Sequence, residues 1–214
     1  MATSEGIPSS IDIEFLELND NPYVAIKQLE DNGEKGIVES GKSTMHLKNG
    51  ESTYSAPKKC VIVGRKHVGD ENGYTYYMAG IPEIVFKDSS LNSSDLKVEM
   101  EDRIPTDSFK QSDCSFVCND FSAITGRTHT GDENGKTSFV QAKLYLSGSK
   151  ADSYELVKSD EFTGDIDIEA ESNGKWATKQ YEGYYMPMTE MGHKGDENAP
   201  THYSFTQWLI KKKG

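Results

Sequence analysis

One string of eleven residues occurs three times in this chain of 214 residues, and this repetition constrains the fold more than any other feature. The copies begin at His67, His129 and His193 and follow the pattern H-x-G-D-E-N-[GA]-x-T-x-[YF]. Successive copies start 62 and 64 residues apart. A period of this length is typical of one supersecondary unit that has been copied. The sequence therefore predicts one domain, residues 1–214, built from three similar units.

The segments around each copy have the two-residue periodicity of β-strands, and none has an apolar period of 3.6 residues with helix caps. We predict three units over residues 22–80, 83–146 and 153–210, preceded by a strand over residues 10–18. The expected strands cover residues 23–29, 43–48, 60–67 and 74–80 in the first unit, 83–87, 96–101, 121–129 and 136–146 in the second, and 154–158, 165–171, 184–193 and 201–210 in the third.

Each copy of the motif is expected at the tip of a β-hairpin, between the third and fourth strands of its unit. Asn72-Gly73 and Asn134-Gly135 favour a tight hairpin turn, because both positions tolerate a positive φ. Ala199-Pro200 replaces this pair in the third copy and predicts a different turn there. Four strands in three units match two layouts, a β-trefoil and a β-prism. The predicted fold class is therefore all-β, with a pseudo-threefold repeat that is β-trefoil-like or β-prism-like.

The charge of the chain excludes some partners. With 35 acidic and 23 basic residues, the formal net charge is −12, which repels the phosphates of nucleic acids and anionic membranes. A cation, a neutral glycan or a basic protein surface fits this charge better. No apolar run approaches the ~20 residues of a transmembrane helix, and the first residues lack the pattern of a signal peptide. We expect a cytoplasmic protein, or one released without a cleavable signal peptide.

The sequence contains no signature of an enzyme. It has no G-x-S-x-G elbow, phosphate-binding glycine loop or H-E-x-x-H helix. Three cysteines without a C-x-x-C pair predict free thiols, with Cys114 and Cys118 too far apart on a strand to bridge. Trp176 and Trp208 are expected as core or interface anchors, and His46 and His202 as ordinary polar side chains.

Each copy of the motif carries two carboxylates, one carboxamide, one imidazole and a nearby aromatic ring. Such groups exchange hydrogen bonds with sugar hydroxyls, and a ring packs on the C–H face of a sugar. The leading hypothesis is a non-enzymatic, lectin-like protein with three hairpin sites, which a toxin or a defence protein would use on a glycosylated cell surface. The predicted ligand-binding residues are His67, Asp70, Glu71, Asn72, Tyr77, His129, Asp132, Glu133, Asn134, Phe139, His193, Asp196, Glu197, Asn198 and Tyr203.

Two alternatives stay open. In the first, His67, His129 and His193 meet at the pseudo-threefold axis as a three-histidine metal site, which suits zinc. Calcium receives weaker support, because the D-E-N carboxylates are contiguous and calcium loops alternate their ligands. In the second, the protein is a structural or toxin module in which the motif only shapes turns. Short polar side chains do this by hydrogen-bonding to nearby backbone groups.

Overall fold

The computed structural model describes residues 21–29, 44–48, 51–69, 73–87, 90–131, 134–159, 163–170, 173–196 and 198–214. Within these ranges the protein is all-β, as predicted, and its one helical element is the 3-10 turn η1 (Ala151–Ser153). The strand expected over residues 10–18 lies outside the described residues. The strands are β1 (Tyr23–Leu29), β2 (Thr44–Lys48), β3 (Glu51–Ser55), β4 (Val61–Val68), β5 (Tyr74–Val85), β6 (Lys97–Met100), β7 (Ile104–Pro105), β8 (Phe109–Lys110), β9 (Asp113–Val117), β10 (Ser122–Thr130), β11 (Lys136–Ser147), β12 (Tyr154–Lys158), β13 (Gly164–Ile168), β14 (Gln180–Tyr181), β15 (Tyr184–Tyr185), β16 (Met188–Lys194), β17 (Thr201–Phe205) and β18 (Trp208–Lys212).

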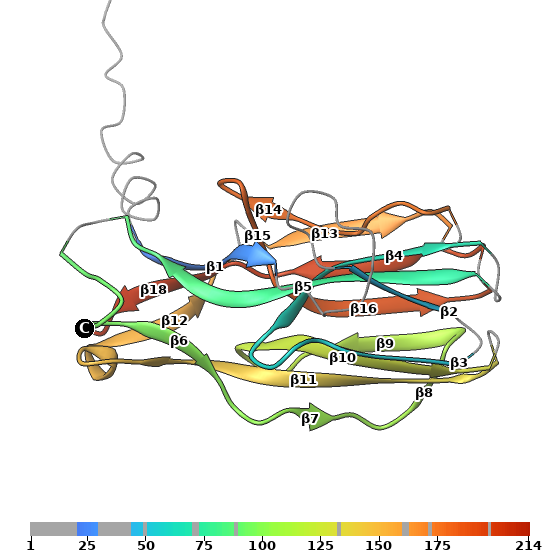
Figure 1. The fold of residues 1–214 in the computed structure, drawn as a ribbon, viewed down its shortest axis with the longest axis horizontal. Coiled ribbons are helices and arrows are strands. Elements are labelled where there is room, and N and C mark those ends of the chain that lie inside the picture. The colour runs from blue at the N-terminus through green and yellow to red at the C-terminus, as the bar shows by residue number, and fades with distance from the viewer. Residues whose placement is uncertain are drawn as a thin grey trace, which may run out of the picture.

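Most strands run along the long axis of the molecule (Figure 1). They form an eight-stranded, a six-stranded and a four-stranded sheet, and all of the strand pairs are antiparallel. Three long hairpins dominate these sheets: β4–β5, β10–β11 and β16–β17. Each hairpin carries one copy of the repeated motif at its tip, where the sequence placed it.

The three hairpins share an irregularity at the same distance from the motif. In each one, the pairing register shifts at the residue four positions before the motif histidine, which is Val63, Thr125 or Thr189. Such a β-bulge bends its strand and increases the local twist. The three equivalent bulges therefore give the three hairpins the same curvature.

The strands that flank each hairpin come from two different units. The second hairpin strand pairs with a strand of its own unit: β5 with β2, β11 with β8, and β17 with β13. The first hairpin strand pairs with a strand of the preceding unit: β10 with β3, and β16 with β9. Residues 173–177 of the third unit complete this cycle by bridging to β4. Each unit thus contributes an edge strand to the sheet of the next unit.

This exchange corrects the predicted assignment of strands. The flanking strands β3 and β9 were not predicted, because β3 is polar and the partners of both strands lie in another unit. The strand predicted over residues 83–87 is wrong as a separate element, since β5 continues through Pro82 to Val85 and pairs there with β1. The first strand of the second unit is instead β6, which pairs with the far end of β11 as β1 does with β5.

The core lies between the hairpins and contains aromatic pairs that join different sheets. Tyr54 of β3 stacks on Tyr77 of β5, with ring centroids 4.3 Å apart. Phe116 of β9 stacks on Phe139 of β11 at 4.6 Å. Trp208 is buried, as expected of an anchor. The exchanged strands β3 and β9 therefore supply the rings that hold neighbouring hairpins together.

Candidate functional site

The three motif histidines are buried at the ends of their hairpins. His67, His129 and His193 expose 1%, 0% and 3% of their surface. Each pairs across its hairpin with the motif threonine, and all three of these threonines are buried as well. The Nδ1 atom of His67 lies 2.9 Å from the hydroxyl of Thr75. The histidine side chains therefore point into the protein rather than towards a ligand in solvent.

The hydrogen bonds of His193 fix the arrangement of its ring. Its Nε2 lies 3.2 Å from the carbonyl oxygen of Gly195, which can only accept, so Nε2 carries the proton. Its Nδ1 then accepts a hydrogen bond from the hydroxyl of Thr201, 2.7 Å away. In the second copy, Nε2 of His129 donates in the same way to Gly131 at 2.9 Å. The imidazole thus ties the turn glycine to the hairpin, and in the third copy to the opposite strand as well.

The turn glycines have a backbone conformation that other residues rarely adopt. Gly69, Gly131 and Gly195 have φ values of +95°, +93° and +119°. A Cβ atom at Gly131 would lie only 3.1 Å from the Cα of Gly135, across the turn. The motif glycine is therefore required by the shape of the tip.

The motif aromatics lie in the core. Tyr77, Phe139 and Tyr203 expose 2%, 1% and 2% of their surface. Tyr77 and Phe139 form the two stacked pairs described above. Tyr203 accepts a hydrogen bond at 2.6 Å from the guanidinium of Arg65, which is also buried. Stacking of these rings on a sugar would require them to leave the core.

The polar letters of the motif occupy the tips themselves. Asn134, Asp196 and Asn198 are exposed. The backbone N–H of Asn198 donates to a carboxylate oxygen of Asp196 at 3.0 Å, so this aspartate shapes the third turn. The remaining predicted ligand-binding residues lie outside the described ranges; they are Asp70, Glu71, Asn72, Asp132, Glu133 and Glu197.

The three tips lie at one end of the molecule, on the right in Figure 1. The second and third tips are joined through residues 111–112. The N–H of Gln111 donates to the carbonyl of Gly135 at 3.0 Å, and the N–H of Gly195 donates to the carbonyl of Ser112 at 2.9 Å. The tips of these two hairpins are therefore neighbours.

Two further segments join the first tip to the others. Residues 48 and 51 pair with Tyr74 of the first hairpin and Thr130 of the second. Residue 168 pairs with Thr201 of the third hairpin, and residue 173 bridges to Val68 of the first. The exchange of strands between units thus brings all three polar tips together at one end of the protein.

The histidines do not form the metal site considered as an alternative. Among the residues that the structure describes, no three His, Cys, Asp or Glu side chains come together as a metal site. The hydrogen bonds of His67 with Thr75, of His129 with Gly131 and of His193 with Thr201 each lie within one hairpin. A zinc site made of His67, His129 and His193 is therefore not supported.

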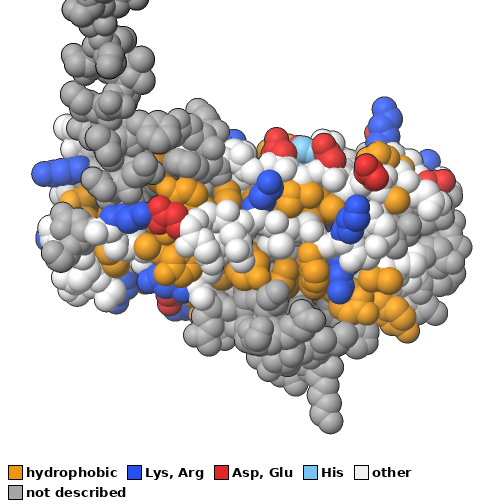
Figure 2. Space-filling model, turned by 90° about the horizontal axis from the view of Figure 1, so that it is seen from above, with side chains coloured by type: hydrophobic (Ala, Val, Ile, Leu, Met, Phe, Trp, Pro, Cys, Tyr) orange, Lys and Arg blue, Asp and Glu red, His pale blue; other side chains and the backbone are white. Residues whose placement is uncertain are grey.

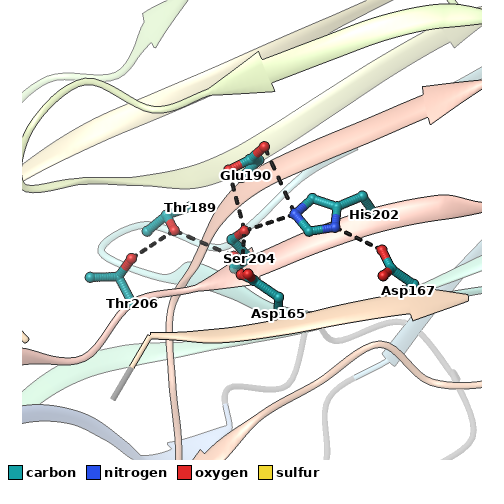
Figure 3. A network of polar contacts seen from close by, with 7 residues as sticks. All are labelled: Asp165, Asp167, Thr189, Glu190, His202, Ser204 and Thr206. Carbon is teal, nitrogen blue, oxygen red and sulfur yellow. Dashed lines mark hydrogen bonds and ion pairs between the residues drawn. The ribbon is translucent and has the colours of Figure 1, made fainter. Parts of the chain in front are cut away.

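A second polar cluster, which the sequence did not predict, lies on β13, β16 and β17 (Figure 3). His202 contacts Asp167 through Nδ1 at 2.8 Å and the hydroxyl of Ser204 through Nε2 at 3.1 Å. The Ser204 hydroxyl also lies 2.8 Å from a carboxylate oxygen of Asp165 and 3.2 Å from one of Glu190. Ser204, Asp165 and Glu190 border a cavity of about 350 Å³.

Asp167, His202 and Ser204 are hydrogen-bonded in the order of a hydrolase triad. The groups around Ser204, however, do not favour nucleophilic attack by its hydroxyl. A nucleophilic serine needs donors for the negative charge that develops beside it. Ser204 faces two carboxylates instead, and it is buried. Cys118 also borders this cavity, and burial, followed by the charge of Glu190, raises the pKa of its thiol. The cluster is therefore better suited to hold hydrogen-bond donors than to attack a substrate.

The only hint of this cluster in the sequence was the alternation of Asp165 and Asp167 with Ile166 and Ile168. This pattern predicts that both carboxylates lie on one face of a strand, but not what they face. All three cysteines are free thiols, as predicted.

Comparisons with known proteins give no family for this chain. No protein-family model matches it, and neither a curated protein nor a solved structure is significantly similar to it. In the described part of the chain, no helix is long and apolar enough to cross a membrane.

Proposed function

We propose that this protein is a non-enzymatic, carbohydrate-binding protein whose recognition face is the end of the molecule that carries the three hairpin tips. One observation carries the proposal: the ends of the three motif hairpins lie at one end of the molecule, with Asn134, Asp196 and Asn198 exposed there. Carboxylates and carboxamides are the groups that exchange hydrogen bonds with vicinal sugar hydroxyls. Three neighbouring weak sites would act together on a multivalent glycan.

The buried contacts divide the motif into two parts. The histidine, threonine, glycine and aromatic residue of the motif stabilise the hairpin. The Asp, Glu and Asn residues remain as candidates for contact with the ligand. We therefore assign the binding role to the D-E-N residues of each copy, and a supporting role to His67, His129, His193, Tyr77, Phe139 and Tyr203. Binding to a glycosylated cell surface would suit a toxin or a defence protein.

We infer that the fold is closer to a β-prism than to a β-trefoil. Two observations support this inference. The hairpin strands lie inside sheets that run along the long axis of the molecule (Figure 1). The second and third hairpins are each flanked by one strand of their own unit and one of the preceding unit, which gives two sets of four strands, and the first hairpin is flanked by β2 and by the bridging residues 173–177. In a trefoil, paired hairpins would instead close a short barrel.

A second candidate role is that of a structural module in which the motif only shapes turns. The contacts of His193 with Thr201 and Gly195 favour it, because they explain these three letters without a ligand. Substitution of the motif glutamate distinguishes the two proposed roles. The three copies of this glutamate, Glu71, Glu133 and Glu197, lie outside the described residues.

The test is a glycan array probed with the wild-type protein and two triple variants. The first variant changes the three motif glutamates to glutamine, which removes charge with little change in shape. Its substitutions are Glu71→Gln, Glu133→Gln and Glu197→Gln. The matched control removes three exposed carboxylates elsewhere. Its substitutions are Glu101→Gln, Asp152→Asn and Glu155→Gln.

We expect the wild-type protein and the control to bind the same glycans, and the motif variant to bind them at least about tenfold more weakly. Circular dichroism and thermal unfolding would show that the motif variant keeps its fold. Absence of wild-type binding to any glycan would refute the proposed function. Equal binding by all three proteins would instead show that the glycan site lies away from the hairpin tips. The motif would then have only its turn-shaping role.

A further inference from the structure

A cavity of about 680 Å³ is distinct from both the hairpin tips and the cluster of Figure 3. It lies between the end of β5 and the strand β6, which belong to two different sheets. Its volume is in the range of small-molecule sites, about 300–1,000 Å³. The glycan sites proposed at the hairpin tips are not part of this cavity.

The floor of this cavity is apolar. Ile84 and Leu96 are buried there and form a small core cluster with Ile210 of β18. Phe86, Val98 and other half-buried side chains extend the same surface. Hydrocarbon that covers such a floor gains roughly 0.8 kcal/mol for each methylene removed from water. The floor is therefore suited to an alkyl chain.

Three lysines and two glutamates line the cavity, although the whole chain is strongly acidic. Lys27 and Glu83 form an ion pair across β1 and β5, with 3.7 Å between the charged atoms. Glu99 accepts a hydrogen bond from the hydroxyl of Tyr145 at 3.2 Å. Lys59 and Lys97 also line the cavity, and neither has a carboxylate partner among the described residues.

Charged and apolar side chains are interspersed on the surface of this protein. On the face seen in Figure 2, Lys and Arg side chains stand near Asp and Glu side chains and among exposed hydrophobic ones. Two ammonium groups beside an apolar cavity provide charge complementarity for one kind of ligand, an alkyl chain that ends in an anionic head group. A cationic amphiphile would be repelled by the same lysines.

We propose that this cavity binds a single-chain amphiphile with an anionic head group, carboxylate or phosphate. The chain lies on the floor formed by Ile84, Leu96 and Val98, and the head group contacts Lys59 and Lys97. A free fatty acid and a lipid within a membrane present the same chemistry. The proposed ligand is the free molecule, because the cavity accommodates one chain between two sheets.

The experiment is titration calorimetry with three ten-carbon ligands below their micelle concentrations. Decanoate is anionic, decanol is neutral and decyltrimethylammonium is cationic. The wild-type protein is expected to bind decanoate about tenfold more tightly than decanol, and the cation most weakly. Equal affinity for all three would overturn the role of the lysines, and no binding of decanoate or decanol would overturn the site itself.

Variants separate the head group from the chain. The double variant Lys59→Glu/Lys97→Glu should weaken decanoate binding about tenfold and leave decanol unchanged. Lys110→Glu/Lys136→Glu applies the same charge change at the hairpin tips and should leave both ligands unchanged. Ser93→Trp places a bulky ring at the exposed edge of the cavity and should weaken both ligands. If the tip variant weakened decanoate as much as the cavity variant, net charge would explain the effect and the proposal would fail.

A final experiment distinguishes a free amphiphile from a membrane lipid as the ligand. Wild-type protein is mixed with neutral phosphatidylcholine vesicles, with and without an anionic lipid, and centrifuged. The protein should stay in the supernatant in both mixtures while it binds free decanoate. Sedimentation with anionic vesicles without binding of decanoate would overturn the proposal in favour of a membrane surface.

Discussion

Substitution of the motif glycine tests whether the repeated string is built around the hairpin turn. In Gly131→Ala, the new Cβ must be accommodated at a φ of +93°, where L-residues are strained, and 3.1 Å from the Cα of Gly135. Backbone strain of this kind costs about 1–3 kcal/mol. For a domain of this size, each kcal/mol lowers the melting temperature by about 2–4 °C. We expect Gly131→Ala to melt about 2–12 °C below the wild type.

Gly192 provides a matched control on β16. Its φ lies outside the left-handed region, and an added Cβ would meet no atom closer than the carbonyl oxygen of Cys114 at 3.7 Å. Gly192→Ala should therefore be neutral, or stabilise the protein by about 0.4–1 kcal/mol through the unfolded state. Calorimetry or urea unfolding measures both variants. Equal stabilities of Gly131→Ala and Gly192→Ala would refute the assignment of the motif glycine to the turn.

Three other predictions concern buried polar groups. Thr201→Val leaves Nδ1 of His193 without its threonine donor and should lower the free energy of unfolding by about 1–3 kcal/mol, measured by urea unfolding. Burial, and the hydrogen bond to Glu182, raise the pKa of Tyr23, so its neutral form stabilises the fold fully below about pH 10 and this stabilisation is lost as the pH rises further. Above that pH, wild-type stability should fall about 1 kcal/mol per pH unit faster than that of Tyr23→Phe, and parallel curves would contradict this. Because burial raises the pKa of Cys118, iodoacetamide should label this thiol at least about tenfold more slowly in the native than in the unfolded protein, as followed by peptide mass spectrometry.

The parts of the fold that sequence predicts well are those that local chemistry decides. The hairpins were placed correctly because turn residues and alternating strands are adjacent in the chain. The exchanged strands β3 and β9 were missed for the opposite reason. The sequence of β3, Glu51–Ser55, is too polar to predict a strand alone, and that of β9, Asp113–Val117, alternates over only five residues; both strands pair with a hairpin of another unit. Pairing between units leaves no periodic pattern in a single segment.

The candidate sites also differ in how far the sequence predicts them. Sequence identified the polar tips, but it did not predict that the motif histidines and aromatics face inward, because a repeated letter does not indicate which side of a strand is buried. The cluster around Ser204 joins three strands whose residues lie up to 39 positions apart, and the cavity above Ile84 lies between two sheets. Neither site follows from any one stretch of the chain.

The contacts between sheets explain why some residues of the repeat are kept and others are not. Tyr54 stacks on Tyr77, and Phe116 on Phe139, whereas Ala177 replaces the ring of the exchanged strand that pairs with Arg65 of β4. A substitution on one side of such an interface can be compensated by a substitution on the other side. The residues at the three interfaces can therefore differ from one another.

The closure of a hairpin allows no such exchange, because histidine, threonine and glycine must fit one another within a single turn. Local geometry therefore accounts for these three letters in every copy. It also accounts for aspartate in the third copy, where Asp196 accepts the N–H of Asn198. The glutamates at positions 71, 133 and 197 lie outside the described residues. The glycan proposal assigns the binding role to the D-E-N residues, so it depends on these glutamates more than on the histidines, whose contacts close the hairpins.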